Sequence, residues 1–291
     1  MEKLGFIGLG IMGKPMSLHL LKGGYEVTVL NSSASAEVLA NEGAKLAPSP
    51  AELAKNCDVV ITCLPDSPEV EAIVFGKEGL IKGLTAGSLF IDMSTISPST
   101  TASIYEALSK LGVESLDAPV SGGEGGAISA SLSIMVGGSQ SAFDRALPIF
   151  EKMGKNIVRI GESGAGQVTK ACNQIVVGLT IQAVAESLNL AKKAGVDVAK
   201  VREALLGGFA QSKIMEVHGQ RFLESNYTPG FKINLHRKDM NIALQTGKDL
   251  SVPLPGSALV ASQMDALIAT GGGELDHSAL AFMLGKLSGI E

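Results

Sequence analysis

The sequence predicts an α/β protein with a Rossmann-type, doubly wound parallel sheet in its N-terminal part and an all-helical C-terminal domain. Two observations predict this architecture. Short apolar runs alternate with helical stretches as far as Gly161, and beyond that point no strand-like alternation occurs. We therefore expect two domains, over residues 1–162 and 163–291.

The first strand–helix–strand unit begins close to the N-terminus. Residues 4–8 form a short apolar run that ends in glycine, and residues 14–22 carry a helical pattern. Gly23 and Gly24 stop that helix, and residues 26–30 follow as the second strand. The whole unit has the length of about 30 residues that a βαβ motif needs.

Further strands and helices continue the same alternation. Two helices should start after Ser49-Pro50 and after Ser97-Pro98, because a serine cap followed by proline in the first turn is a common helix start. The further strands are expected at residues 59–64, 89–92, 114–117, 133–136 and 157–160.

The part of the chain after Gly161 is expected to be helical. A long helix should cover about residues 167–194, since no cluster of Gly and Pro interrupts its pattern. The later helical segments are separated by short loops at Gly207-Gly208, Thr228-Pro229-Gly230 and Gly271-Gly272-Gly273.

Composition and charge favour a globular protein that does not bind nucleic acid. Of the 291 residues, 45% are hydrophobic and 18% are charged, which is enough to bury a sizeable core. The formal net charge is −5 and Lys and Arg form no long run, so no broad positive field is available for a phosphate backbone. The start of the chain does not resemble a signal peptide, and the apolar stretches are too short for a membrane span. We expect a cytoplasmic protein.

Cysteine and histidine spacing gives no sign of a disulfide framework or a metal site. The three cysteines lie in apolar surroundings without CxxC spacing, so we expect them to behave as small buried hydrophobes. They are Cys57, Cys63 and Cys172. His19, His218 and His277 have no metal-type spacing to carboxylates or cysteines, and we therefore predict no metal site.

The glycine turn after the first strand matches a dinucleotide-binding pattern. Gly8-Leu9-Gly10-Ile11-Met12-Gly13 has the spacing G-x-G-x-x-G directly between a strand and a helix. Gly8 allows the tight turn, Gly10 lets the backbone approach a pyrophosphate, and Gly13 allows close contact between helix and sheet. The N–H groups at the helix start can then bind the phosphate charge. An ordinary glycine turn is the alternative, and the strand and helix on either side favour coenzyme binding.

The second strand ends in Asn31-Ser32-Ser33 instead of an acid. A carboxylate at this place accepts hydrogen bonds from the ribose hydroxyls of NAD. Its absence removes repulsion against a 2′-phosphate, which small polar residues can bind, although no Arg stands nearby to clamp it. We expect NADP in preference to NAD. Leu64-Pro65-Asp66 and Ser94-Thr95 follow two further strands at the same edge, either as turns and caps or as ligand contacts.

Three constellations could act on a substrate. Asp117-Ala118-Pro119-Val120-Ser121-Gly122-Gly123 ends a strand with a hydroxyl and two glycines, which form either a tight turn or a cradle for a carboxylate.

Gly164-x-Gly166-x-x-x-Lys170 places a lysine about one turn into the long helix, with Asn173 and Gln174 on roughly the same face. A lysine near a helix start is disfavoured as a cation, which suits a proton donor to an alkoxide; a surface lysine is the alternative. Lys238 either reaches a ligand or lies on a solvated helix face.

These motifs, in this order, resemble the β-hydroxyacid dehydrogenase family. The resemblance includes residues 5–16 around the glycine turn and covers essentially the whole chain, through Asn234-Leu235-His236-x-Lys238-Asp239 and the tail Asp276-His277-Ser278-Ala279-Leu280-Ala281. The family includes 3-hydroxyisobutyrate dehydrogenases, tartronate semialdehyde reductases and glyoxylate/succinic semialdehyde reductases. The C-terminal half resembles the tartronate semialdehyde (2-hydroxy-3-oxopropionate) reductases among them.

The resemblance implies an NAD(P)-dependent oxidoreductase, a homodimer or homotetramer, that acts on a small carboxylate-bearing aldehyde or alcohol. Lys170 would be the acid/base, and Asp239 would orient Lys238. The implied substrate contacts are Ser121, Gly122, Gly123, Asn173 and Gln174, the last of which is usually Asn in the family. The implied cofactor contacts are Gly8, Leu9, Gly10, Ile11, Met12, Gly13, Asn31, Ser32, Leu64, Pro65, Thr95 and Lys238. A non-catalytic NADP(H) sensor is the alternative from another class of protein.

Overall fold

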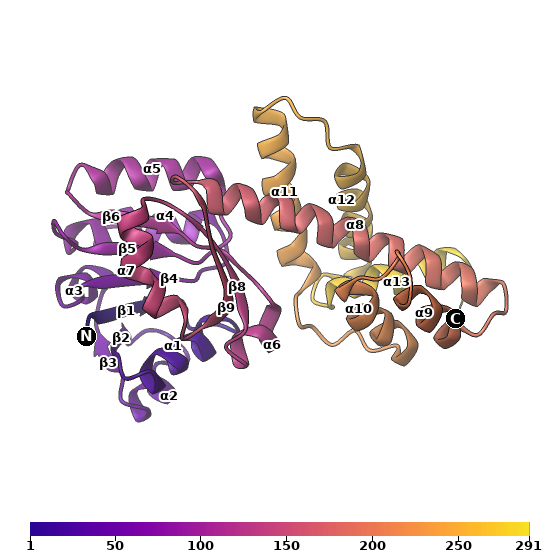
Figure 1. Cartoon of the computed structure of the whole chain (residues 1–291), viewed down its shortest axis with the longest axis horizontal. Helices are drawn as coiled ribbons and strands as arrows, with labels where there is room; N and C mark the ends of the chain where they lie inside the picture. The colour runs from indigo at the N-terminus through magenta and orange to yellow at the C-terminus, as the bar shows by residue number, and fades with distance from the viewer. Residues whose placement is uncertain (291) are drawn as a thin grey trace. The chain divides into compact units, whose positions relative to one another are not determined.

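The computed structural model describes residues 1–290, which form two compact units. The boundary falls between Lys170 and Ala171, inside helix α8 (Ala165–Lys193). Unit 1 therefore holds the sheet and the first turns of α8, and unit 2 holds the rest of the described chain. In Figure 1 the sheet runs from indigo to magenta, and the later helices are orange to yellow.

Unit 1 is built around one nine-stranded sheet. Its order is β3-β2-β1-β4-β5-β6-β8-β7, with β9 paired to β8. The strands from β3 to β6 pair in parallel, whereas β8 runs antiparallel to β6 and β7. The strands are β1 (Lys3–Ile7), β2 (Glu26–Leu30), β3 (Lys45–Ala47), β4 (Val59–Thr62), β5 (Leu89–Asp92), β6 (Glu114–Asp117), β7 (Val120–Ser121), β8 (Leu132–Gly137) and β9 (Gly154–Gly161).

Helices connect these strands, and two of them begin as the sequence predicted. The Ser49 hydroxyl accepts a hydrogen bond from the Glu52 N–H, and the Ser97 hydroxyl accepts one from the Thr100 N–H, each with proline in the first turn. The helices of unit 1 are α1 (Gly13–Lys22), α2 (Ala36–Asn41), α3 (Pro50–Lys55), α4 (Ser67–Phe75), η1 (Leu80–Lys82), α5 (Pro98–Ser109), α6 (Gly123–Ile128) and α7 (Gln140–Phe150).

The predicted doubly wound α/β architecture is confirmed, and β1 to β6 are parallel as expected. The predicted strands at 26–30, 89–92 and 114–117 coincide with β2, β5 and β6. The strands β3 and β7 were not predicted, because three and two residues are too few to show a pattern. The reversed direction of β8 was also not predicted, since side-chain periodicity carries no information on strand direction.

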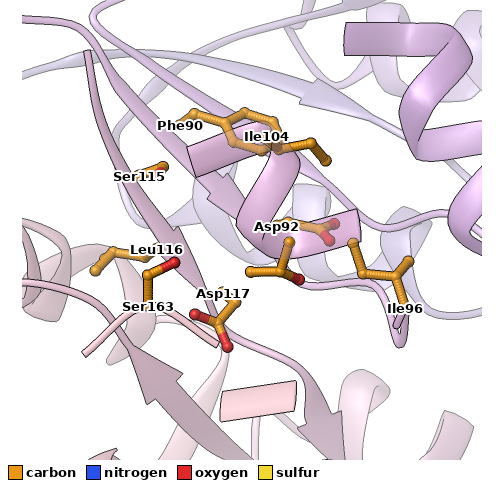
Figure 2. A pocket seen from close by; sticks show the side chains of 9 residues that line it. Phe90, Asp92, Ile96, Ile104, Ser115, Leu116, Asp117 and Ser163 are labelled. Atoms are coloured by element: carbon orange, nitrogen blue, oxygen red, sulfur yellow. The ribbon is translucent and has the colours of Figure 1, made fainter. Parts of the chain in front are cut away.

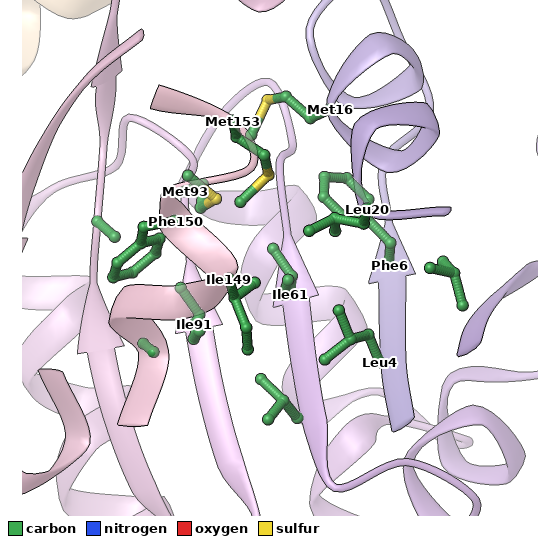
Figure 3. Close-up of a cluster of buried hydrophobic side chains, with 14 of the residues drawn as sticks. Leu4, Phe6, Met16, Leu20, Ile61, Ile91, Met93, Ile149, Phe150 and Met153 are labelled. Carbon is green, nitrogen blue, oxygen red and sulfur yellow. The ribbon is translucent and has the colours of Figure 1, made fainter. Parts of the chain in front are cut away.

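Alternate residues of the central strands face two separate hydrophobic cores. In β4, Val59 and Ile61 pack into a core with α1 and α7, whereas Val60 packs into a core with α3, α4 and α5. Successive side chains of a strand point to opposite faces, so a strand covered on both faces needs a continuous apolar run. Figure 3 shows the first core, where Phe6 and Phe150 lie among the buried side chains.

Unit 2 consists of the remainder of α8 and the helices that follow. One isolated bridge, Lys232 with Asp276, is the only β-type pairing within residues 171–290, so the expectation of a helical C-terminal part is confirmed. Ile181 of α8 packs into one core of this unit, and Leu188 packs into another. The further helices are α9 (Val198–Leu206), α10 (Lys213–Glu224), α11 (Ile233–Asp249), α12 (Pro255–Leu267), η2 (Ile268–Gly272), η3 (His277–Ala279) and α13 (Leu280–Leu287).

Helix α8 is apolar along much of its length. By length and composition alone it could cross a membrane, and half of its 18-residue apolar window is buried inside the protein. Cys172 lies on the exposed side of this helix, so the expectation that all three cysteines are buried is wrong for this residue. Cys57 is buried and Cys63 is half-buried.

Candidate active site

The glycine turn between β1 and α1 has the geometry that each of its glycines was expected to provide. Gly8 has φ +101°, and a Cβ there would lie 2.2 Å from the Cys63 carbonyl oxygen. A Cβ on Gly13 would lie 1.8 Å from the Gly8 oxygen, so only glycine lets α1 start this close to the turn. A Cβ on Gly10 would meet no described atom within 4 Å, which leaves an open approach to the backbone.

The start of α1 is suited to an anion. Met12 occupies the cap position and, within the described chain, makes no side-chain cap hydrogen bond. The first turn contains no acidic residue that would repel a phosphate. The backbone N–H groups and the helix dipole then favour negative charge at this end. These residues fit the pyrophosphate of a dinucleotide.

The other predicted cofactor contacts in unit 1 lie at the carboxyl ends of neighbouring parallel strands. Asn31 and Ser32 are exposed after β2, and Thr95 is half-buried after β5. After β4, the Leu64 N–H donates to the Ser94 hydroxyl at 2.8 Å, which joins the two loops. Pro65 follows in an exposed position. In doubly wound sheets, this edge is where ligands bind.

Lys170 is buried beside the predicted substrate cradle. It is 7% exposed, and its Nζ donates a hydrogen bond of 2.8 Å to the carbonyl oxygen of Val120. Val120 immediately precedes Ser121 in β7, and Gly122 and Gly123 follow with φ +138° and +61°. The burial of Lys170 is incompatible with the alternative of a surface lysine. Unit 1 thus brings the amine and the Ser-Gly-Gly turn together.

Two residues that the sequence analysis did not assign to the site hold the first turn of α8. Asp117, at the end of β6, accepts hydrogen bonds from the Gly164 and Gln167 N–H groups. The Gln167 side chain bonds to the loop that follows β5. The only signal in the sequence was the glycine pair at 164 and 166, which predicts close packing at the helix start but does not identify its partner.

In unit 2, the remaining predicted residues form a connected polar group. The Gln174 amide donates to the Asp239 carboxylate at 2.5 Å, and the Asn173 amide donates to the Gln174 side-chain oxygen at 2.7 Å. Lys238 forms an ion pair of 2.8 Å with Asp239. Gln174 and Asp239 are buried, and Asn173 and Lys238 are half-buried. The ion pair fits the orienting role for Asp239 that the family resemblance implies.

Histidines that are far apart in sequence meet in unit 2, which the spacing analysis could not show. Ligand atoms of His218, Asp276 and His277 lie within 4.8 Å of one another. Burial lowers the pKa of both imidazoles. The Asp276 carboxylate, however, lies 3.7 Å from the Arg221 guanidinium and already accepts four hydrogen bonds. Their donors are the N–H groups of Gly230, Phe231 and Ser278 and the Ser278 hydroxyl. The carboxylate therefore acts as the cap of η3.

The fold and the site define an NAD(P)-dependent oxidoreductase, and comparisons with known proteins agree. Residues 3–161 match the family described as the NAD binding domain of 6-phosphogluconate dehydrogenase. Residues 164–284 match the family described as NAD-binding of NADP-dependent 3-hydroxyisobutyrate dehydrogenase. The chain belongs to the β-hydroxyacid (3-hydroxyisobutyrate) dehydrogenase family, which confirms the resemblance inferred from its motifs.

Individual relatives cover almost the whole chain. A 2-hydroxy-3-oxopropionate reductase of Escherichia coli is 46% identical, over 96% of this chain and 95% of its own. The solved structure of a Mycobacterium tuberculosis 3-hydroxyisobutyrate dehydrogenase with L-serine is 32% identical, with a TM-score of 0.89 over 98% and 99% of the two chains. The structure of Psf3 in complex with NADP+ and 2-OPP is 26% identical, with a TM-score of 0.87 over 97% and 99%.

Proposed function

We propose that the protein reduces a small carboxylate-bearing semialdehyde with NAD(P)H, and that the substrate is tartronate semialdehyde (2-hydroxy-3-oxopropionate). The observation that supports this most strongly is the burial of Lys170, whose amine donates a hydrogen bond to the Val120 carbonyl next to Ser121. The choice of substrate is supported by the 46% identity to the reductase of Escherichia coli.

The coenzyme would be held by the glycine turn and the loops at the same sheet edge. The residues of unit 1 are Gly8, Leu9, Gly10, Ile11, Met12, Gly13, Asn31, Ser32, Leu64, Pro65 and Thr95, and the family resemblance adds Lys238 as a further contact. When bound, the nicotinamide supplies a hydride to the aldehyde carbon. The residues of the chain then have to orient the substrate and provide a proton.

Lys170 provides that proton. As the carbonyl carbon is reduced, negative charge develops on its oxygen, and the Lys170 ammonium stabilises this alkoxide and transfers a proton from Nζ to it. In the reverse direction the neutral amine takes the proton back. The Val120 carbonyl, which accepts a hydrogen bond from the same amine, fixes where Nζ lies.

The Ser121–Gly123 turn would hold the substrate carboxylate. The positive φ angles of Gly122 and Gly123 turn the backbone sharply after the Ser121 hydroxyl, so hydroxyl and N–H groups can converge on an anion. Asn173 and Gln174 are the further substrate contacts that the family resemblance implies. A fixed carboxylate leaves the aldehyde one main orientation toward the hydride donor, which lowers the entropic cost of the reaction.

We further propose NADP in preference to NAD. Asn31 and Ser32 at the end of β2 are exposed and uncharged, so they neither repel a 2′-phosphate nor offer the carboxylate that NAD enzymes use. The values of kcat/KM for NADPH and NADH test this directly. A clear preference for NADH would refute it.

Glyoxylate, succinic semialdehyde and 3-hydroxyisobutyrate are the alternative substrates within the family. The TM-score of 0.89 to a 3-hydroxyisobutyrate dehydrogenase supports the last of these. A non-catalytic NADP(H) sensor would need neither the buried lysine nor the Ser-Gly-Gly turn, so their presence disfavours that class. Steady-state rates with each substrate and each coenzyme test all these alternatives, and tartronate semialdehyde should give the highest kcat/KM.

We also propose a cytoplasmic homodimer or homotetramer, with residues 1–162 as the coenzyme domain and residues 163–291 as the substrate and subunit-contact domain. Large apolar side chains are exposed in the second part, among them Val176, Leu190, Phe209, Leu259 and Leu287. Where exposed apolar side chains form a contiguous patch, that patch commonly marks a protein–protein interface. Size-exclusion chromatography with light scattering should give a mass of two or four chains, and a monomer would contradict the proposal.

A further inference from the structure

The position of Lys170 depends on how the first turn of α8 is attached to the sheet. The helix begins at Ala165, so the lysine follows within its second turn. A Cβ on Gly166 would lie 2.5 Å from the carbonyl oxygens of Asp117 and Met135. One on Gly137 would lie 2.8 Å from the Gly166 nitrogen. Two glycines thus let the helix start lie directly against β6 and β8, which leaves little freedom for movement.

Asp117 caps this helix from a neighbouring strand. Its carboxylate accepts the Gly164 N–H at 2.7 Å and the Gln167 N–H at 2.9 Å, one on each oxygen. The N–H groups of a helix start need acceptors from outside the regular helical pattern. Here a single buried side chain, 2% exposed, provides both. The contact fixes the first turn of α8 in position and in rotation.

Gln167 ties the same turn to the loop after β5. Its side-chain oxygen accepts the Ile96 N–H at 3.2 Å, and its amide donates to the Ser94 carbonyl at 2.8 Å. These two bonds lie on either side of Thr95, a residue of the proposed coenzyme site. Gln167 is 1% exposed and stands three residues before Lys170, on roughly the same helix face. The lysine and the coenzyme loop are thereby attached to each other through one side chain.

Asp117 occupies an environment that opposes its charge. Burial, with a smaller contribution from Asp92, its direct partner on β5, raises the pKa of its carboxyl to about 6. Figure 2 shows both carboxylates among the side chains that line a small cavity beside α5. Serine or asparagine caps a helix without a buried charge. A charged group in such a setting is more typical of a functional site than of a purely structural cap.

We propose that Asp117 and Gln167 are positioning residues for Lys170. Together they hold the first turn of α8 against β6 and against the loop that follows β5. The lysine amine therefore stays beside the Ser121 turn and at a fixed place relative to the coenzyme. The inference rests on the proposed acid/base role of Lys170. Neither residue touches the reacting atoms in this scheme.

The first test compares Gln167→Met with a control in the same helix. Methionine keeps the volume of the side chain but removes both bonds to the loop. The control is Gln182→Met, because Gln182 is also buried in α8 and, among the described residues, its amide donates to Glu186 of the same helix. We expect Gln167→Met and Asp117→Asn to lower kcat by about 10- to 100-fold, because a shift of the lysine amine by about 1 Å has an effect of this size. The KM for NADPH should change by less than about twofold. Gln182→Met should keep kcat, and unchanged kcat in both site variants would overturn the inference.

The second test asks whether the effect passes through Lys170. Gln167→Met and Asp117→Asn are each combined with Lys170→Ala, with single-turnover oxidation of NADPH as the readout where steady-state rates are too low. If these residues act through the lysine, their substitution should lower the rate by less than about twofold in the Lys170→Ala background. An equal loss in both backgrounds would overturn the positioning role while leaving the proposed function intact. Near-normal kcat in Lys170→Ala alone would instead refute the proposed function. Should Asp117→Asn fail to fold, Gln167→Met carries both tests.

Discussion

The amine of Lys170 donates a hydrogen bond of 2.8 Å to the carbonyl oxygen of Val120, the residue that directly precedes Ser121. This contact joins two motifs that are 50 residues apart in the sequence. It places a buried amine donor beside a hydroxyl and two glycines with positive φ. The proposed chemistry depends on this pairing, because proton transfer and carboxylate binding must occur at one small substrate.

The glycine turn gives a pair of variants with different expected effects. Gly10→Ala should weaken NADPH binding by about tenfold or more with an unchanged melting temperature, because the added Cβ meets no described atom but occupies the pyrophosphate approach. Gly13→Ala should lower the melting temperature as well, since its Cβ would lie 1.8 Å from the Gly8 oxygen.

Fluorescence titration with NADPH and thermal unfolding measure these two effects. Gly125→Ala is the matched control, because Gly125 also has open space around its Cβ position and lies outside the glycine turn. NADPH binding of normal strength in Gly10→Ala would contradict the placement of the pyrophosphate.

The end of β2 should control coenzyme choice. Ser32→Arg adds a guanidinium that can pair with a 2′-phosphate, so the ratio of kcat/KM for NADPH over NADH should rise by about tenfold. Ser32→Asp should lower the same ratio, because a carboxylate repels the phosphate and accepts bonds from the ribose hydroxyls. If neither variant changes the ratio, the 2′-phosphate does not lie at this loop.

Asp117 should make stability depend on pH in a predictable direction. Its pKa in the folded protein is raised from 3.8 to about 6, so the native state binds this proton more tightly than the unfolded state does. Ionisation of Asp117 therefore lowers the free energy of unfolding as the pH rises from about 4 to about 6, by about 3 kcal/mol. Above that range the loss is complete, and below it the protonated carboxyl carries no such cost.

Asp117→Asn removes this titration. The free energy of unfolding of the variant minus that of the parent protein should therefore increase by about 3 kcal/mol between about pH 4 and about pH 7. Urea denaturation at several pH values measures the difference. The contributions of the other carboxyls to the pH dependence are largely the same in the two proteins and therefore cancel. A difference that does not vary with pH would show that Asp117 titrates normally.

The local elements of the fold could be predicted because their signals lie within a few residues. The Ser49 and Ser97 caps, the glycine turn at Gly8–Gly13 and the apolar run of β4 each carry their own physical reason. The site was predicted as separate motifs only. That Nζ of Lys170 meets Val120 depends on the packing of α8 against β6 and β8, which no spacing in the sequence shows.

The same limit explains what the sequence analysis missed. Asp117 was seen as the end of a strand, and its role as the cap of a helix that starts 48 residues later became visible only in three dimensions. His218 lies far from Asp276 and His277 in sequence, and a search for metal-type spacing could not place them together. Cys172 was expected to be buried because its neighbours are apolar, but it lies on the exposed face of α8.

The most direct measurement is the kcat for reduction of tartronate semialdehyde by Lys170→Ala, compared with Lys155→Ala, which changes an exposed lysine of β9. We predict that kcat falls by about 10²- to 10⁴-fold in Lys170→Ala, with the Kd for NADPH within about threefold of the parent value, and that Lys155→Ala keeps full activity. A kcat for Lys170→Ala within about threefold of the parent protein would contradict the assignment of this lysine as the acid/base.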